Sequence, residues 1–585
     1  MTRLLKYQRE SLRLILQEYE SKYDQRERMV RSQVSGVGYH TTLRNATVHP
    51  TRTSLTYAVA LLDSQDERNL HRAISILRRV IALQDKDPES RTYGIWSWYL
   101  EEPLESMSPP DWNWADFCGV QLLAAYRDHR QRLPDDLNEI LKTSILHAAR
   151  SIQRRNVGPH YTNIAIMGTY VTLVAAETFD VLDLLKYAKE RARRVHEYVT
   201  YHGSFNEYNS PTYSVVAVRE LSRILMDARD EGTRGWMKEI HDLGWGHIAR
   251  HFHPPTRQWA GPHSRCYQTD LRRRPETLAF IQAGTNNAVR FFKDEPLPLG
   301  LSGYRLRIAC PKEFVPMFVS LDRERTVVET FTRADPSSPG KRLPVVGTTF
   351  LGKHLTLGSV NRSNFWNQRR AILAYWGTPE QPTYLHVRFL HDGYDYSSAL
   401  VAAVQQESDL LAAVTFATDG GDTHPGLDPV KNATIRARDL RLRFQFGADV
   451  SSLVLPQECC SGKPITVTDR NIAVSLFLIA ADFNGRMTSL EIHRDETHPG
   501  IDVVLHSGEE QEFDFSKMND ATIAFCLRVE ERRKQYDLPW DAFARVQEDR
   551  CLCYWKRPGG TLRLSVPRKP GPYKQMQDSF EIDTL

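Results

Sequence analysis

A twelve-residue segment, HGSFNEYNSPTY at 202–213, concentrates side chains that can do acid–base chemistry. It contains a carboxylic acid at Glu207 and two phenols at Tyr208 and Tyr213. The Asn-Ser-Pro sequence that follows Tyr208 is typical of a helix cap and first turn. A plain connector between two helices has no use for phenols and amides at this density. We therefore predict that the segment presents Tyr208 and Tyr213 to a ligand.

This segment is one of four polar clusters that are spaced about 50 residues apart along the chain. The other three are DWNWADF around Asp116, GPHYTN around Asn163 and AGPHSRCY around Arg265. Two helices of ~15–20 residues and two short loops fill such an interval. Helical hairpins that repeat around a ring would place all of these clusters, together with Tyr213, at one end of it. The alternative is an irregular helical bundle in which these loops are only capped turns.

Large aromatic residues gather near the first cluster, in a stretch that reads as loop. They are Trp96, Trp98, Tyr99, Trp112 and Trp114. Flat aromatic faces among polar groups suit the C–H face of a sugar ring, although the same residues could instead plug the centre of the ring of helices. The candidate substrate-binding residues in this half are Trp112, Trp114, Asp116, His160 and Glu207.

The periodicity of the chain changes between its two halves. Up to about residue 250, apolar residues recur every three or four positions, as in IAIMGTYVTLVAAETF. Beyond about residue 300, short β-branched and aromatic runs such as TYLHVRFL alternate apolar with polar residues. Helices followed by strands, without interleaving, predict separate domains. We predict an (α/α) toroid of helical hairpins over residues 1–290 and one or more antiparallel β-sandwich domains over residues 291–585.

The strand-rich half contains one polar candidate segment, residues 354–377. Arginines and amides beside a Trp suit an acidic saccharide held across a domain interface. The alternative is a strip of interdomain ion pairs or a charged sheet edge that discourages strand pairing. We favour that alternative for the two consecutive arginines at 369 and 370. The candidate binding residues here are Arg362, Trp366 and Gln368.

Composition excludes several classes of protein. The 76 basic and 72 acidic residues leave a formal net charge of +4, which argues against a nucleic-acid partner. No apolar run is long enough to span a bilayer, and the first twenty residues read as an amphipathic helix without a secretory signal. We therefore expect a cytoplasmic protein without a membrane partner, whose eight cysteines are free thiols. No nucleotide-binding glycine motif and no complete set of metal ligands stands out, so we expect neither a cofactor nor a metal.

The order of these motifs resembles a known group of enzymes. Asn163 in one loop, a Gly-Ser-Phe loop at 203–205 that ends at Tyr213, and a later Ser264-Arg265 pair resemble the polysaccharide lyases that cleave hyaluronate, chondroitin or xanthan. The plan of a helical toroid followed by a β-sandwich is also similar to that of the heparinase II/III-like and alginate lyases. The resemblance implies an acidic oligosaccharide or polysaccharide as substrate. It also implies cleavage at a uronic acid by β-elimination, which gives a 4,5-unsaturated uronate.

The resemblance assigns roles to three residues. Asn163 and Arg265 would neutralise the uronate carboxylate, so that the proton on C5 becomes acidic. Tyr213 would remove that proton and then protonate the leaving O4, provided that a nearby cation lowers its pKa. The expected active site therefore combines an amide, a guanidinium and a phenol.

The identity of the base stays open at this point. Tyr208 stands where the lyases have a histidine, three residues after the Phe. An imidazole could come instead from His160 or His263. Alternatively, Tyr208 and Tyr213 could divide the work as base and acid.

Two other functions compete with the lyase. An inverting glycoside hydrolase of the (α/α) toroid type would need two carboxylates ~6.5–9.5 Å apart, for which Asp111 or Asp116 could pair with Glu207. A carbohydrate-binding protein without catalysis would use the same aromatic residues and arginines. A lyase creates a C=C bond that absorbs in the near ultraviolet, a hydrolase creates only reducing ends, and a binding protein creates neither.

Overall fold

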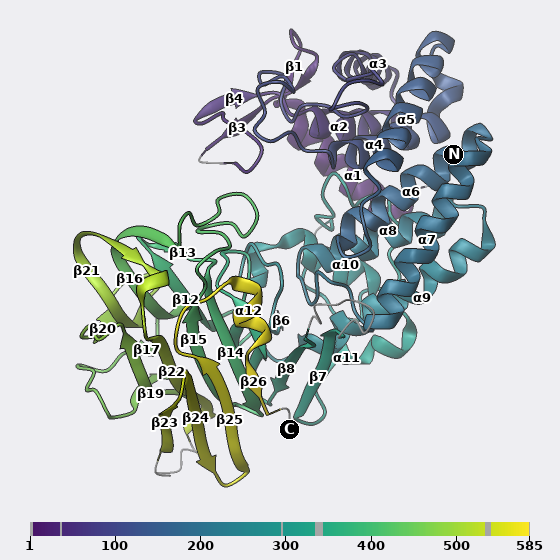
Figure 1. Cartoon of the computed structure of the whole chain (residues 1–585). Helices are drawn as coiled ribbons and strands as arrows, with labels where there is room; N and C mark the ends of the chain where they lie inside the picture. The colour runs from purple at the N-terminus through teal and green to yellow at the C-terminus, as the bar shows by residue number, and fades with distance from the viewer. Residues whose placement is uncertain (1–3, 36–37, 294–295, 334–342, 533–539, 584–585) are drawn as a thin grey trace.

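Helical and β structure follow one another along the chain in the order expected from the sequence (Figure 1). The computed structural model describes residues 4–35, 38–293, 296–333, 343–532 and 540–583. Within these residues, helices dominate the first half and antiparallel strands the second. The prediction of a helical toroid plan followed by β-sandwich structure is confirmed.

Four helical hairpins form the first part. The inner helices are α2 (Thr51–Asp63), α4 (Trp114–His129), α6 (Thr162–Phe179) and α8 (Tyr213–Asp227). The outer helices are α3 (Glu67–Ile81), α5 (Asp135–Arg155), α7 (Leu182–His202) and α9 (Glu231–His251). Each inner helix packs against the outer helix that follows it, and the inner helices pack on one another in the order α2, α4, α6, α8. The hairpins form an arc in Figure 1.

The division into inner and outer helices follows from composition. In α6, every residue from Thr162 to Ala176 is buried, as expected for a helix that is apolar on all sides. In α7, the buried residues recur at helical spacing, for example Leu184, Ala188 and Ala192. The charged residues between them are exposed or half-buried except Arg191, which is buried, so α7 covers the inner layer mainly with one face.

Shorter elements complete the helical part. They are the helices α1 (Lys6–Glu20), α10 (Pro275–Gly284) and α11 (Pro316–Val319), the 3-10 turns η1 (Arg130–Arg132), η2 (Leu271–Arg273) and η3 (Lys312–Phe314), and the hairpins β1 (Tyr23–Asp24) with β2 (Met29–Val30), β3 (Ser32–Val34) with β4 (Ala46–Val48), and β5 (Phe252–His253) with β6 (Gln258–Trp259). The domain boundary after residue 290 stays a prediction. Side chains beyond it, such as Leu299, Tyr304 and Phe318, belong to the helical core. Each helix of the described residues is too short or too polar to cross a lipid bilayer.

Three antiparallel sheets make up the second part. The nine-stranded sheet contains β20 (Ser489–His493), β21 (Gly500–Asp514), β16 (Thr434–Ala448), β12 (Pro382–His391), β11 (Ile372–Gly377), β9 (Leu355–Val360), β8 (Val345–Leu351) and β7 (Arg325–Thr332) in that order, with β13 (Tyr394–Asp395) beside β12. The seven-stranded sheet has the order β10 (Arg362–Asn364), β14 (Ala399–Gln406), β15 (Asp409–Phe416), β22 (Ala521–Glu531), β19 (Ile472–Phe483), β18 (Ile465–Asp469) and β17 (Leu453–Val454). The four-stranded sheet has the order β23 (Asp541–Gln547), β24 (Arg550–Arg557), β25 (Gly560–Pro567) and β26 (Glu581–Ile582). The turn η4 (Phe515–Lys517) and helix α12 (Tyr573–Asp578) connect strands of these sheets.

The seven-stranded sheet is the middle layer and is buried on both faces. Leu410 of β15 and Phe525 of β22 face a core shared with the nine-stranded sheet. Their neighbours Leu411 and Cys526 face a second core shared with the four-stranded sheet. Because successive residues of a strand point to opposite faces, both faces of β15 must be apolar. This explains why β15, DLLAAVTF, lacks the polar alternation of a strand with one solvated face.

A buried glutamate joins the helical part to the β part. Glu329 of β7 accepts a hydrogen bond from Arg250 Nε at 2.5 Å and pairs with the imidazole of His247, both on α9. Burial opposes ionisation of this carboxyl, but His251, His247 and Arg250 outweigh it and lower the pKa of Glu329 to about 2. The ionised form therefore stabilises the contact between α9 and β7.

Replacing this carboxylate should loosen the contact in a pH-dependent way. A folded-state pKa below the unfolded value contributes stability above that value, and the contribution is lost as the pH falls. We expect Glu329→Gln to lower the unfolding free energy by about 3 kcal/mol at pH 7, with a difference from wild type that shrinks between about pH 5 and pH 2. Thermal unfolding followed by circular dichroism measures it, with the exposed Glu313→Gln as the matched control. A difference that does not change with pH would contradict the assigned charge.

Candidate active site

The inner helices begin at the same end of the helical arc, and their first residues touch. The Trp114 indole N–H donates to Thr51 Oγ1 at 2.9 Å, which joins the start of α4 to the start of α2. Asn113 Nδ2 donates to the Tyr161 hydroxyl at 3.2 Å, which joins α4 to α6. The partial positive charge of several helix N-termini therefore gathers at this end, where it favours an anionic ligand.

Arg265 lies at the centre of the residues that gather there. Its Nη1 donates to Glu207 Oε1 at 3.0 Å, its Nη2 to the Tyr213 hydroxyl at 3.0 Å, and its Nε to Gln368 Oε1 at 2.6 Å. Burial works against the charge, but the neighbouring Tyr213 and Glu207 outweigh it and raise the pKa of Arg265. The guanidinium thus stays charged and fixes two residues of the 202–213 segment and one residue of the β part.

Aromatic rings enclose this guanidinium. Its carbon lies 4.2 Å from the ring centroid of Tyr213 and 4.8 Å from that of Trp366. The Trp366 ring meets the edge of His424, with centroids 5.0 Å apart, and His424 lies 4.7 Å from Tyr39. The site is therefore built from the N-terminal segment, the helical part and the β part together.

The phenol of Tyr213 sits between a cation and a second phenol. Besides Arg265, its hydroxyl lies 2.8 Å from the Tyr267 hydroxyl. The cation that the sequence required beside Tyr213 is therefore present. Burial nevertheless outweighs Arg265 and raises the pKa of Tyr213 above its ordinary value. Tyr213 consequently carries its proton at neutral pH, and the expected lowering of this pKa does not occur.

Asn163 and Glu207 form the buried side of the site. The Asn163 backbone N–H donates to Glu207 Oε2 at 3.3 Å. Its side-chain Oδ1 accepts from the Ile164 N–H at 2.8 Å, whereas its Nδ2 has no acceptor among the described residues. Burial raises the pKa of Glu207, against the opposing effects of Arg265 and the Asn163 N–H. The Asn163 amide therefore has a donor free for a ligand.

The aromatic cluster divides into separate roles. Trp96 is fully buried and donates to the Val80 carbonyl at 2.9 Å, so it plugs the helical core. Trp98 stacks on Trp114 with centroids 5.0 Å apart. These two rings, with Tyr99 and Arg52, line a pocket of about 330 Å³.

The fifth member, Trp112, takes no part in that pocket's lining. It donates to the Arg91 carbonyl at 3.2 Å and packs near the Arg91 guanidinium. Only part of the cluster thus offers a sugar-sized surface.

Four other candidates lie away from Arg265 or point elsewhere. His263 is buried with Nδ1 2.6 Å from the Asn209 carbonyl oxygen, and burial lowers its pKa to about 3. Tyr208 is buried and stacks on Phe331 at 4.0 Å. The exposed His160 side chain lies next to Gly158. Arg362 donates to the Gln577 carbonyl at 2.8 Å. The geometry therefore favours Tyr213 over these residues for a proton transfer.

Sequence reasoning missed four residues of the site: Arg52, Tyr39, Tyr267 and His424. Tyr267 stands two positions after Arg265, so its proximity could have been inferred from extended backbone. The other three reach the site only through long-range packing. Within the described ranges, no group of three or more His, Cys, Asp or Glu side chains is arranged to hold a metal ion.

Comparisons with known proteins leave the reaction open. The family described as "Domain of unknown function (DUF8769)" matches residues 21–289. No curated protein matches the chain. Among solved structures, heparinase III is similar over 97% of this chain and 92% of that chain, with 10% identity and a TM-score of 0.48. A second heparinase III structure, with methylated lysines, covers 97% and 91% with 10% identity and a TM-score of 0.34.

One further solved structure comes from a different class of enzyme. Endoglucanase CelQ from Clostridium thermocellum, complexed with cellotriose, is similar over 91% of this chain and 94% of that chain, with 10% identity and a TM-score of 0.27. Identities of 10% and TM-scores below 0.5 say nothing about the reaction, so its assignment depends on the side chains of the site.

Asp116 lies behind the site and is sealed from solvent. It is 2% exposed, and its Oδ1 has no hydrogen-bond partner among the described residues. A Cβ on Gly168 of α6 would lie 2.7 Å from this oxygen and from Arg191 Nη2, so the glycine makes room for both. Burial, only partly opposed by Arg191, raises the pKa of Asp116 to about 7.

The buried Asp116 should make stability fall as the pH rises. A carboxyl whose pKa is higher in the folded than in the unfolded state must take up a proton on folding, so stability falls as the pH rises from the unfolded pKa to the folded pKa. We expect the wild type to lose up to about 4 kcal/mol relative to Asp116→Asn between pH 4 and pH 8. Thermal unfolding of both proteins across this range measures the difference. Parallel pH dependences would show that Asp116 is already ionised at low pH.

Proposed function

We propose that this chain is a polysaccharide lyase that cleaves a glycosidic bond at a uronic acid by β-elimination, with Tyr213 as the proton-transfer residue. The observation that carries the proposal is the Tyr213 hydroxyl, held 3.0 Å from Arg265 Nη2 and 2.8 Å from the Tyr267 hydroxyl. The Asn163 amide, joined to this site through Glu207, supplies a free donor. A phenol, a guanidinium and an amide are the groups that an elimination at a uronate requires.

The uronate carboxylate would be neutralised by Asn163 and by a cation. The Asn163 Nδ2 has an unused donor, as described above, while the donors of Arg265 already serve Glu207, Tyr213 and Gln368. Arg52, at the start of α2, has no carboxylate partner among the described residues. Its guanidinium lies 3.7 Å from the Phe117 ring centroid, and burial lowers its pKa against the opposing effects of neighbours that include Glu220 and Asp111. A half-buried cation without a counterion is costly, and a substrate carboxylate would offset that cost.

In the proposed mechanism, the Tyr213 phenol carries out both proton transfers. The Tyr213 phenolate removes the proton from C5, and the electron pair left behind forms the C4=C5 double bond as the C4–O4 bond breaks. Tyr213 then returns the proton to O4 of the departing sugar, which regenerates the phenolate without water being added. Arg265 stabilises the phenolate before the first transfer and again after the second.

The rival hydrolase finds less support in the same site. Glu207 is engaged by Arg265 and the Asn163 N–H through its two oxygens. Asp111 accepts from the Trp98 indole and the Asn113 N–H in the same way. Asp116 is sealed behind α6. An inverting hydrolase needs one carboxyl at the leaving oxygen and one at a water molecule. Glu207 and Asp111 already accept hydrogen bonds on both oxygens, and Asp116 is closed off from solvent.

Removing the Tyr213 hydroxyl should abolish elimination. We expect Tyr213→Phe to lower kcat by about 10²- to 10⁴-fold, because it loses both proton transfers. The assay is the near-ultraviolet absorbance of the unsaturated uronate during incubation with a panel of uronic-acid oligosaccharides and polysaccharides. Tyr201→Phe, at an exposed tyrosine of α7, is the matched control. Reducing ends that form without this absorbance, and that disappear in Glu207→Gln, would establish a hydrolase instead.

The pH profile should report the raised pKa of Tyr213. Only the phenolate form can accept the C5 proton, and its fraction rises tenfold per pH unit below the pKa. Since burial holds this pKa above its ordinary value, kcat/KM should climb through about pH 6 to 9 without a plateau. Initial rates in buffers of constant ionic strength measure the profile. A plateau near neutrality would assign the base to a group other than Tyr213.

A further inference from the structure

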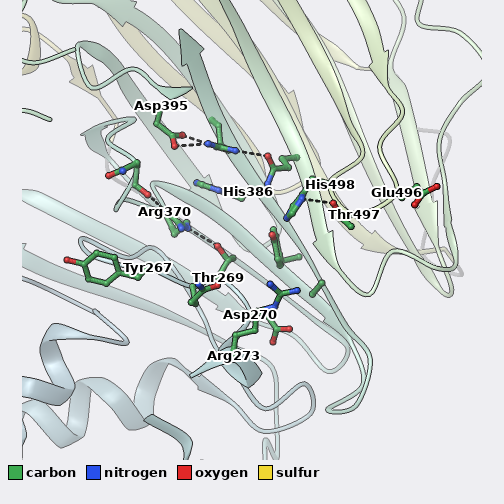
Figure 2. Close-up of a pocket in the computed structure, with 16 residues that line it drawn as sticks. Tyr267, Thr269, Asp270, Arg273, Arg370, His386, Asp395, Glu496, Thr497 and His498 are labelled. Atoms are coloured by element: carbon green, nitrogen blue, oxygen red, sulfur yellow. Dashed lines mark hydrogen bonds and ion pairs between the residues drawn. The ribbon is translucent and has the colours of Figure 1, made fainter. Parts of the chain in front are cut away.

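We propose that a second pocket, next to the Arg265 cluster, binds a sugar unit that carries a carboxylate or sulfate group. This Arg370 pocket is lined by Tyr267, Arg273, Arg370, His386, Arg388 and His498, among others, and has a volume of about 320 Å³. Figure 2 shows Tyr267 at one side of the pocket and Glu496 and Thr497 at the other, with Arg370 between them. Its lining comes from the segment after Arg265, from β12 and from the turn before β21.

Arg370 is a buried, fixed cation that forms no ion pair with a carboxylate in the described ranges of the chain. It is 7% exposed. Its Nε donates to Thr269 Oγ1 at 2.9 Å, and its Nη1 donates to the carbonyls of Asn367 and Arg369 at 2.8 and 2.9 Å. Its Nη2 has no acceptor in the part of the chain that the structure describes. Burying a charge without a counterion is unfavourable, so an anion at Nη2 would be strongly favoured.

Three carboxyl groups line the pocket, those of Asp270, Asp395 and the exposed Glu496, and none forms an ion pair with Arg370 among the described residues. Asp395 is held by Arg388 through two bonds, at 2.8 and 2.7 Å, as the dashed lines in Figure 2 show. Asp270 caps η2 and binds the Arg272 side chain, with Nη2 to Oδ2 at 2.8 Å. Arg273 is exposed and has no ion pair among the described residues. The pocket thus has two arginines, at 273 and 370, available to an anion.

The pKa values of the two histidines that line the pocket, His386 and His498, are both lowered. Burial, together with Arg370 and Arg388, holds the pKa of His386 well below its ordinary value. Burial also lowers the pKa of His498, where the opposing effect of Asp495 is met by those of Arg388 and Arg273. At neutral pH both rings are therefore uncharged and can serve as hydrogen-bond partners for a sugar hydroxyl.

The pocket continues directly from the proposed catalytic site. Tyr267 lines the pocket and places its hydroxyl 2.8 Å from that of Tyr213. Asn367 lines it next to Gln368, which binds Arg265. A volume of about 320 Å³ is at the small end of ligand sites, ~300–1,000 Å³, and suits a single sugar ring. The placement of this sugar next to the cleaved bond rests on the proposed function. The binding of an anionic sugar in the pocket does not depend on it.

The test compares binding of charged and uncharged saccharides. Titration calorimetry would use Tyr213→Phe protein, which cannot turn over, with a uronic-acid tetrasaccharide, its sulfated form and its carboxyl-reduced form. Arg370→Gln and Arg273→Gln should each weaken binding of the charged saccharides about 10- to 100-fold and leave the weak binding of the neutral one unchanged. Arg273 makes no side-chain bond to a described residue, so its replacement keeps the test valid if Arg370→Gln misfolds. Arg323→Gln, at an exposed arginine outside the pocket, is the matched control.

Each result decides between the two proposals. A preference for the sulfated over the unsulfated tetrasaccharide that is lost in both variants assigns the pocket to sulfate, and equal losses for the two assign it to carboxylate. Unchanged affinity for charged saccharides in both variants would overturn the inference, whatever the enzyme does. If the wild type forms no unsaturated product from the same saccharides while the variants still weaken binding, the lyase is refuted and the anionic pocket stands.

Discussion

The Arg265 guanidinium is the interaction on which the site depends. Its three nitrogen atoms donate hydrogen bonds to Glu207, Tyr213 and Gln368. One cation therefore connects the loop before α8 to the β part of the molecule. Charge-assisted hydrogen bonds of this kind are the strong ones in a protein, and a partly buried arginine without them would be destabilising. The same bonds that fix the domain interface therefore fix the reactive phenol, and removing Arg265 would disturb both.

Much of the plan, and part of the site, follows from sequence. The spacing of about 50 residues between polar clusters reflects hairpins whose inner helices all begin at one end, and this brings Asn163 close to Glu207 and Tyr213 close to Arg265. Trp366 and Gln368 were chosen only for their chemistry, yet they lie against Arg265. No local sequence pattern marks Tyr39, His424 or Arg52 as part of a site. The sequence around each of them would be the same if its only role were to form secondary structure. The four-stranded sheet could not be predicted from sequence either. A strand such as β15, which is buried on both faces, can be recognised as such only when the sheets that cover each face are known.

Burial decides which of several similar residues can take part in chemistry. His263 and Tyr213 both stand near Arg265 in the sequence or in space, but the His263 ring is enclosed and bonded to a backbone carbonyl, whereas the Tyr213 hydroxyl meets a second, exposed phenol. Arg52 and Arg370, which have no carboxylate partner among the described residues, line separate pockets, one containing Trp98 and one containing Tyr267. An acidic saccharide chain would supply the negative charges that this arrangement lacks.

The most direct test of the account is mass spectrometry of the cleavage products formed in ¹⁸O-labelled water. Elimination breaks the C4–O4 bond without adding water, so the account predicts that the masses of the two products sum to that of the substrate and that neither contains ¹⁸O. One product would also carry the double bond, and the other would keep the glycosidic oxygen as its new reducing-end hydroxyl. A product pair heavier than the substrate by one labelled water molecule would contradict elimination and establish hydrolysis.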